Sequence, residues 1–214
     1  MDEQFRRTDF ADTRTAGTPC RNAIIERFCA GEHVFIAAGV SDAKDLALVS
    51  YVANKRRGQK LIIVPYEISE ERLRTIIAAI DGRSLLYAQC SAQTDFTGVQ
   101  VLIIDFLGAL PRIYHYGHCA YIGGGCRDRF FARGIARKAI RRQRRATPYA
   151  ENASLKANDK HNPLEAAACG LPVAWRAGFL RRRGPQKSTG PIHACTVRSG
   201  RELDKWLQSL RANE

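Results

Sequence analysis

Runs of apolar residues alternate along the chain with segments whose apolar positions recur every three or four residues. The runs predict buried strands at residues 33–38, 60–65, 84–88, 100–105, 118–122, 171–175 and 193–198. Helical spacing predicts helices at residues 22–29, 42–57, 69–80, 108–116, 162–170 and from Ser199 onward. Strands that alternate with helices in this way indicate a parallel, doubly wound α/β sheet.

Two of the predicted helices show clearly which face should be buried. Ser69 is a good N-cap, with Glu70 and Glu71 in the first turn after it, and Ser199 begins the C-terminal helix in the same manner. The inward positions we expect in these two helices are Leu73, Ile76, Ile77 and Ile80, and Leu203, Trp206, Leu207 and Leu210.

One further helix has both ends marked in the sequence. Asn162 suits the N-cap, Pro163 the first helical position and Gly170 the end. Upstream, residues 121–125 form an apolar strand that leads into three consecutive glycines. Ligands of α/β sheets usually bind outside the carboxyl ends of the strands, beside helix N-termini, so both segments indicate such a place.

Composition excludes several classes of protein. The chain of 214 residues is 45% hydrophobic, which is enough for a core, but it contains no apolar run of the roughly 18 to 20 residues that span a bilayer. Residues 1–7 are polar, so we expect no signal peptide. The seven cysteines include no Cys-x-x-Cys pair. We therefore expect no disulfide framework, no zinc site and a reducing, cytoplasmic setting.

The net charge of +13 is concentrated in two segments. Residues 126–160 carry eleven Lys/Arg against three Asp/Glu, and residues 176–187 carry five Lys/Arg and no acid. These segments account for the whole excess, because the remaining residues balance. The fold as a whole is therefore not expected to bind polyanions.

Several short motifs follow one another in a specific order. They are Pro65-x-Glu67, Asp105-x-x-Gly108, the strand and glycine loop at 121–125, His161-Asn162-x-Leu164-Glu165, and Gly170-Leu171-Pro172-Val173. In this order they resemble the 3-deoxy-D-manno-octulosonic acid (Kdo) transferases of lipopolysaccharide synthesis, specifically their C-terminal, donor-binding half. The resemblance covers residues 10–125, 161–175 and 195–211.

The resemblance implies a glycosyltransferase with a GT-B fold, of which this Rossmann-like domain is one half. It divides the chain into a crossing segment at 1–31 and a donor-binding domain at 32–214, with a basic insert at 126–160. CMP-Kdo is the implied donor and a lipid A precursor the acceptor, at the inner face of the cytoplasmic membrane. Transfer in the family needs no metal, and we expect no metal site and no cofactor. Its general base lies in an N-terminal acceptor domain, so we assign no catalytic residue here and expect this chain alone to be incomplete.

The implied donor-binding residues are Pro65, Glu67, Gly108, Gly123, Gly124, Gly125, His161, Asn162 and Glu165. A carboxylate at Glu165 can accept hydrogen bonds from both ribose hydroxyls, but Asn162 and Glu165 also have the spacing of a capping box that needs no ligand. His161 and the helix N-terminus can bind a phosphate or carboxylate.

The glycines and the strand ends also allow two interpretations each. Residues 123–125 either let the backbone approach the donor or form a turn with positive φ. Gly108 is expected near the cytosine or phosphate, whereas Asp105 either meets ligand or ties a loop. The chain departs from the family at Tyr66, where a histidine is usual, and at residues 39–42, where a Gly-Ser-Thr-Trp type of turn is usual and only Ser41 keeps a hydroxyl.

Three interpretations of the basic stretches 126–160 and 176–194 remain open. They can contact an anionic membrane surface or lipid phosphates, bind nucleic acid, or be sequence without function from a reading-frame error. Nucleic acid is the least favoured partner. The alternatives for the whole chain are a Rossmann-like binding module with a basic nucleic-acid-binding arm, or a GT-B glycosyltransferase that uses another nucleotide-sugar.

Overall fold

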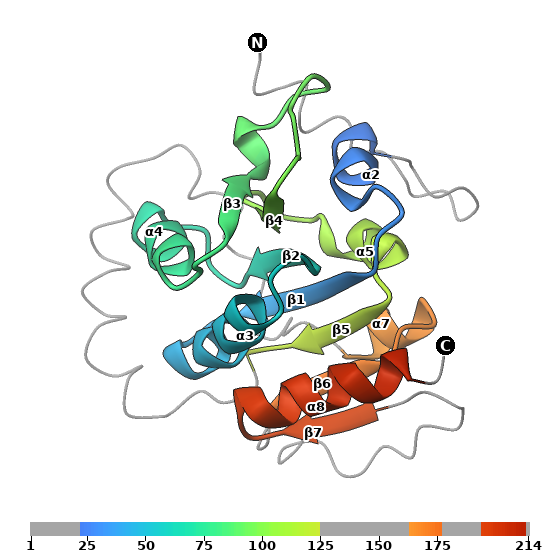
Figure 1. The fold of residues 1–214 in the computed structure, drawn as a ribbon. Helices are drawn as coiled ribbons and strands as arrows, with labels where there is room; N and C mark the ends of the chain where they lie inside the picture. Colours follow the sequence, from blue (N-terminus) through green and yellow to red (C-terminus); the bar gives the residue numbers. More distant parts are fainter. Residues whose placement is uncertain (1–21, 125–162, 177–193, 213–214) are drawn as a thin grey trace.

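A single parallel sheet organises the molecule. The computed structural model describes residues 22–124, 163–176 and 194–212 (Figure 1). Its strands are β1 (Val34–Val40), β2 (Lys60–Pro65), β3 (Arg83–Leu86), β4 (Val99–Ile103), β5 (Cys119–Ile122), β6 (Val173–Arg176) and β7 (Ala194–Val197). They form a seven-stranded sheet in the order β3-β4-β2-β1-β5-β6-β7, and every neighbouring pair is parallel. This confirms the predicted doubly wound α/β class.

Helices cover both faces of the sheet. They are α2 (Ala23–Cys29), α3 (Ala43–Lys55), α4 (Glu70–Ala78), α5 (Leu110–Ile113), α7 (Pro163–Ala168) and α8 (Gly200–Arg211), with 3₁₀ turns η1 (Tyr87–Gln89) and η2 (Tyr114–Tyr116). Helices α3, α4 and α8 pack on one face, and α2, α5 and α7 on the other (Figure 1). None of the helices in these described parts is long and apolar enough to cross a bilayer.

The apolar runs in the sequence follow from this layering. Along β1, Ile36 and Ala38 point into the layer of α2, α5 and α7, whereas Phe35 and Ala37 point into the layer of α3, α4 and α8. Every residue of β1 is buried. A parallel strand covered on both faces has no solvent side, so its sequence shows an apolar run rather than alternation.

Most predicted element limits agree with the structure to within a few residues, and the differences are local. The strand expected at 84–88 ends at Leu86, and Tyr87 begins a 3₁₀ turn. Asp105 follows β4 instead of ending it. The predicted inward face of α4 is wrong at Ile77, which is 39% exposed, because the helix turns only a narrow face with Ile76 toward the sheet.

Helix α2 is tied into the same core as the sheet. Ile25 and Phe28 are fully buried, and Asn22 caps the helix by accepting a hydrogen bond from the Ile25 N–H at 3.1 Å. The Asn22 side-chain amide also donates to the Tyr87 hydroxyl at 2.8 Å. The domain boundary at residue 31 stays a prediction, although α2 clearly shares the packing of the residues that follow it.

Replacement of Asn22 by alanine is expected to lower the free energy of unfolding by about 2 kcal/mol, because it removes the cap of α2 and the hydrogen bond to the Tyr87 hydroxyl. Urea unfolding followed by tryptophan fluorescence measures the loss. Asn22→Asp, which keeps the cap, is the matched control and should lose less. Equal losses in the two variants would contradict the capping role.

The strand order changes direction at β1. The chain passes from β1 to β2 and on to β3 and β4 on one side, and then returns to place β5 on the other side of β1. The carboxyl ends of β1 and β5 are therefore the topological switch point, where open α/β sheets usually bind ligand.

Candidate functional site

Glycine allows the ends of β1 and β5 to approach closely at the switch point. The Gly123 N–H donates to the Ala38 carbonyl at 2.8 Å. A Cβ added at Gly123 would lie 2.7 Å from the carbonyl oxygen of Gly39, closer than side chains pack in real proteins. Gly124, with φ of +84°, continues the chain in a conformation that favours glycine. The end of β1 and the glycines after β5 are the centre of the candidate site.

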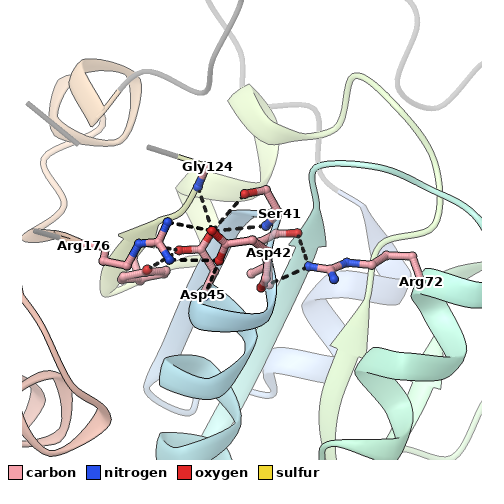
Figure 2. A network of polar contacts seen from close by, with 8 residues as sticks. Ser41, Asp42, Asp45, Arg72, Gly124 and Arg176 are labelled. Carbon is pink, nitrogen blue, oxygen red and sulfur yellow. Dashed lines mark hydrogen bonds and ion pairs between the residues drawn. The ribbon is translucent and has the colours of Figure 1, made fainter. Parts of the chain in front are cut away.

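A fully buried carboxylate, Asp45 in the first turn of α3, lies beneath these turns. Its Oδ2 atom accepts hydrogen bonds from the Gly124 N–H at 2.9 Å and the Ser41 hydroxyl at 3.0 Å (Figure 2). The Ser41 N–H is also directed to it, at 3.3 Å. Asp45 therefore joins the loop after β1 to the loop after β5.

The second oxygen of Asp45 is held from within the sheet. The Tyr121 hydroxyl on β5 donates to Oδ1 at 2.8 Å. Burial, together with the nearby charge of Asp45, raises the pKa of Tyr121 far above its usual value. The phenol consequently stays protonated and serves as a permanent donor to the carboxylate.

An ion pair closes the network from the β6 side. Arg176, only 7% exposed at the end of β6, donates from both terminal nitrogens to Asp42, at 2.9 and 2.8 Å (Figure 2). Its Nε lies 3.5 Å from Asp45 Oδ1. Asp42 also caps α3 by accepting the Asp45 N–H at 2.8 Å. One guanidinium thus serves two carboxylates.

The titration of this pair is shifted by its contacts. Burial raises the pKa of Asp42, but the hydrogen bonds from Arg176 and from the Asp45 N–H outweigh burial, so the pKa lies below its usual value. Burial lowers the pKa of Arg176, yet the two carboxylates reverse this and raise it. Both groups therefore remain charged at neutral pH.

A second arginine reaches the same turn from the opposite side. Arg72, on α4, donates from Nη2 to the carbonyl oxygens of Val40 and Asp42 at 3.2 and 3.4 Å (Figure 2). Val40 and Pro65 are register partners at the ends of β1 and β2. Arg72 therefore lies over the β1–β2 side of the site, whereas Arg176 lies over the β6 side.

The predicted donor-binding residues are only partly brought together. Pro65, Gly123 and Gly124 surround the end of β1. Glu67 is exposed just after β2, and Gly108 is exposed in the loop after β4, with φ of +86°. Both follow strands whose carboxyl ends share this edge of the sheet, but neither takes part in the polar network. Gly125, His161 and Asn162 lie outside the described residues.

Glu165 is an exposed carboxylate in the first turn of α7. Burial raises the pKa of Tyr114 on η2, and the charge of Glu165 adds to this rise. The Tyr114 hydroxyl is buried and has no hydrogen-bond partner within the described residues. Glu165 is therefore available to solvent and to a ligand, while its relation to Asn162 stays a prediction.

The structure shows that Asp105 ties a loop, while a contact of Asp105 with ligand stays a prediction. Its carboxylate accepts a hydrogen bond from the Ala88 N–H at 3.0 Å and thereby ties the loop after β3 to the end of β4. Within the described residues, no group of three or more His, Cys, Asp or Glu side chains is arranged to hold a metal ion.

Sequence reasoning missed Asp45, Tyr121, Arg72 and Arg176. The spacing of Asp42 and Asp45 matches a capping box and was a usable signal for a fixed helix start. Arg176 carried no such signal, because it begins a stretch interpreted only as basic insert.

The chain aligns with the C-terminal CMP-Kdo-binding domain of WaaA from Acinetobacter baumannii with a TM-score of 0.55, over 88% of this chain and 86% of that one. The two share a fold. The sequence identity is 14%, so the likeness establishes the Rossmann-like architecture expected of a GT-B half and nothing of the ligand. No protein-family model matches the sequence, and a comparison with curated proteins finds no match.

Proposed function

We propose that the chain binds CMP-Kdo as the donor-binding half of a Kdo transferase. The observation that supports this most directly is agreement between two independent features. The ordered sequence motifs resemble the donor-binding half of these enzymes, and the fold resembles a domain described as binding CMP-Kdo. Several motif residues, Pro65, Gly123 and Gly124 among them, lie at the switch point where such a sheet binds ligand.

The proposed reaction is transfer of Kdo from CMP-Kdo to a lipid A precursor, at the inner face of the cytoplasmic membrane. The family resemblance supports the acceptor and the location. Within the donor site, the exposed carboxylate of Glu165 hydrogen-bonds the ribose hydroxyls, and the side-chain-free surface at Gly124 lets the nucleotide approach the backbone. Gly108, exposed after β4, lies against the base or phosphate.

A thermal-shift and denaturation screen with CMP, UDP and GDP tests the proposal. CMP at 100 times its dissociation constant is expected to raise the free energy of unfolding by about 2.7 kcal/mol, with smaller effects from UDP and GDP at the same concentration. Glu165→Gln should weaken CMP binding, since an amide cannot accept both hydroxyls as a carboxylate does. Glu71→Gln, an exposed carboxylate on α4, is the matched control and should bind as the wild type.

The other outcomes are equally informative. Selective stabilisation by UDP or GDP would replace the donor with another nucleotide-sugar. No stabilisation by any of the three nucleotides would overturn the nucleotide-sugar proposal altogether.

A further inference from the structure

Backbone N–H groups at the switch point are the first place to look for an anion-binding site, because such groups commonly bind phosphate. Here they already have a partner. The N–H groups of Gly124 and Ser41 both point at the carboxylate of Asp45, at 2.9 and 3.3 Å. Asp45 is fully buried and belongs to the chain itself. An anionic ligand therefore finds these donors occupied.

The charge of Arg176 is already paired with carboxylates of the chain itself. Its guanidinium makes two short hydrogen bonds to Asp42 and lies near Asp45, and the side chain is almost completely buried. Because two carboxylates surround this one guanidinium, Arg176 adds no net positive charge to the site.

Arg72 differs from Arg176 in its partners. Its Nη2 is held by two backbone carbonyls, which are neutral, and no carboxylate of the described residues forms an ion pair with it. Its Nε is buried and makes no hydrogen bond within the same residues. A guanidinium carries five donors, so within the described residues part of the hydrogen-bonding capacity of Arg72 and its positive charge have no partner.

The place of Arg72 relative to the proposed ligand surface is fixed by the turn that it binds. The Val40 carbonyl that accepts from Arg72 also accepts from the Tyr66 N–H at 3.2 Å. The Tyr66 side chain is 45% exposed, and its ring lies 3.9 Å from the position that a Cβ on Gly124 would take. Arg72, Tyr66 and Gly124 thus border one turn at the carboxyl edge of the sheet.

We propose that Arg72 binds the phosphate of the nucleotide donor. A planar guanidinium matches the oxygens of a phosphate, and one that has no carboxylate partner within the described residues breaks no ion pair there when it takes an anionic ligand. The proposal rests on the proposed nucleotide-sugar function and assigns its anion contact to a residue outside the motifs that indicated the site. It also explains how the site can bind an anion although the N–H groups of Gly124 and Ser41 already donate to Asp45.

Isothermal titration of the full chain with CMP and with cytidine tests the assignment, because the two ligands differ only in the phosphate. The wild type is expected to bind CMP more tightly than cytidine. Arg72→Met should weaken CMP binding by roughly ten- to a hundred-fold, the range for a lost charge-assisted hydrogen bond, and leave cytidine binding unchanged. Arg74→Met, which removes an exposed arginine paired with Glu70 on the same helix, is the control and should leave both affinities unchanged.

A second variant covers the structural role of Arg72 at the β1 turn. Arg72→Lys keeps a cation and a donor for the carbonyls but loses the planar fork, so CMP binding should weaken several-fold and cytidine binding should not. If circular dichroism shows that Arg72→Met is unfolded, the CMP affinity of Arg72→Lys decides whether Arg72 binds the phosphate. Unchanged CMP affinity in the folded variants overturns the assignment to Arg72 and leaves the proposed function standing. Failure of both CMP and cytidine to bind the wild type overturns the proposed function and this inference together.

Discussion

Asp45→Ala is expected to lower the free energy of unfolding by about 3–5 kcal/mol, the range for breaking a buried charged contact. The carboxylate accepts from Gly124, Ser41 and Tyr121 and is completely shielded from water. Its removal leaves buried donors without an acceptor, and each such group costs about 1–3 kcal/mol. Urea unfolding followed by fluorescence of Trp175 and Trp206 measures the change.

Two controls separate this effect from loss of any acid. Asp81→Ala removes an exposed carboxylate paired with Arg57 at 3.5 Å and should change stability by no more than about 0.5 kcal/mol. Asp45→Asn keeps the shape of the side chain but turns an N–H group toward donors, so it should still lose about 2 kcal/mol. A loss below about 1 kcal/mol in Asp45→Ala would show that the network does not hold the two loops together.

The sheet could be predicted because burial on both faces leaves a direct trace in the sequence. Residues 60–65 are bounded by polar or turn residues and match β2 to the residue. The prediction fails at Tyr87, where the Cys90 N–H bonds back to the Tyr87 carbonyl and Asp105 holds Ala88. The contact with Asp105 spans 17 positions and cannot be inferred from local spacing.

The site was predictable only where the backbone itself demanded a residue type. Gly123 and Gly124 stood out because a close approach and a positive φ both require glycine. The sequence did not single out Asp45, whose carboxylate accepts a hydrogen bond from the N–H of Gly124, 79 positions away. Arg176 contacts Asp42 across 134 positions, from within a stretch whose composition indicated only surface charge. Long-range ion pairs of this kind leave no local pattern.

Arg176→Met is expected to lower the free energy of unfolding by about 3 kcal/mol at pH 7, because it leaves Asp42 and the buried Asp45 without their shared cation. The methionine keeps much of the apolar stem, so most of the loss is electrostatic. The same urea titration, repeated between pH 7 and pH 3, measures the loss and its pH dependence.

The sign of the pH dependence follows from Asp42. Its pKa in the folded chain lies below the value of about 3.9 expected for an unfolded chain, so its pair with Arg176 stabilises the fold above that pH and is lost as the pH falls through the lower folded pKa. In the variant, Asp42 lacks the guanidinium and takes up a proton at higher pH, which relieves the unpaired charge. The difference between wild type and variant should therefore be largest near neutral pH and shrink below about pH 4.

A double variant, Asp42→Asn with Arg176→Met, provides the control for this interpretation. Asparagine retains the N-cap of α3 while removing the charge, so the double variant should lose clearly less than the sum of the two single changes. Its stability relative to the wild type should also vary less with pH between 5 and 3 than that of Arg176→Met. A loss in Arg176→Met that stays constant from pH 7 to pH 3 would show that Arg176 acts through packing. The ion pair with Asp42 would then not be what fixes β6 to α3.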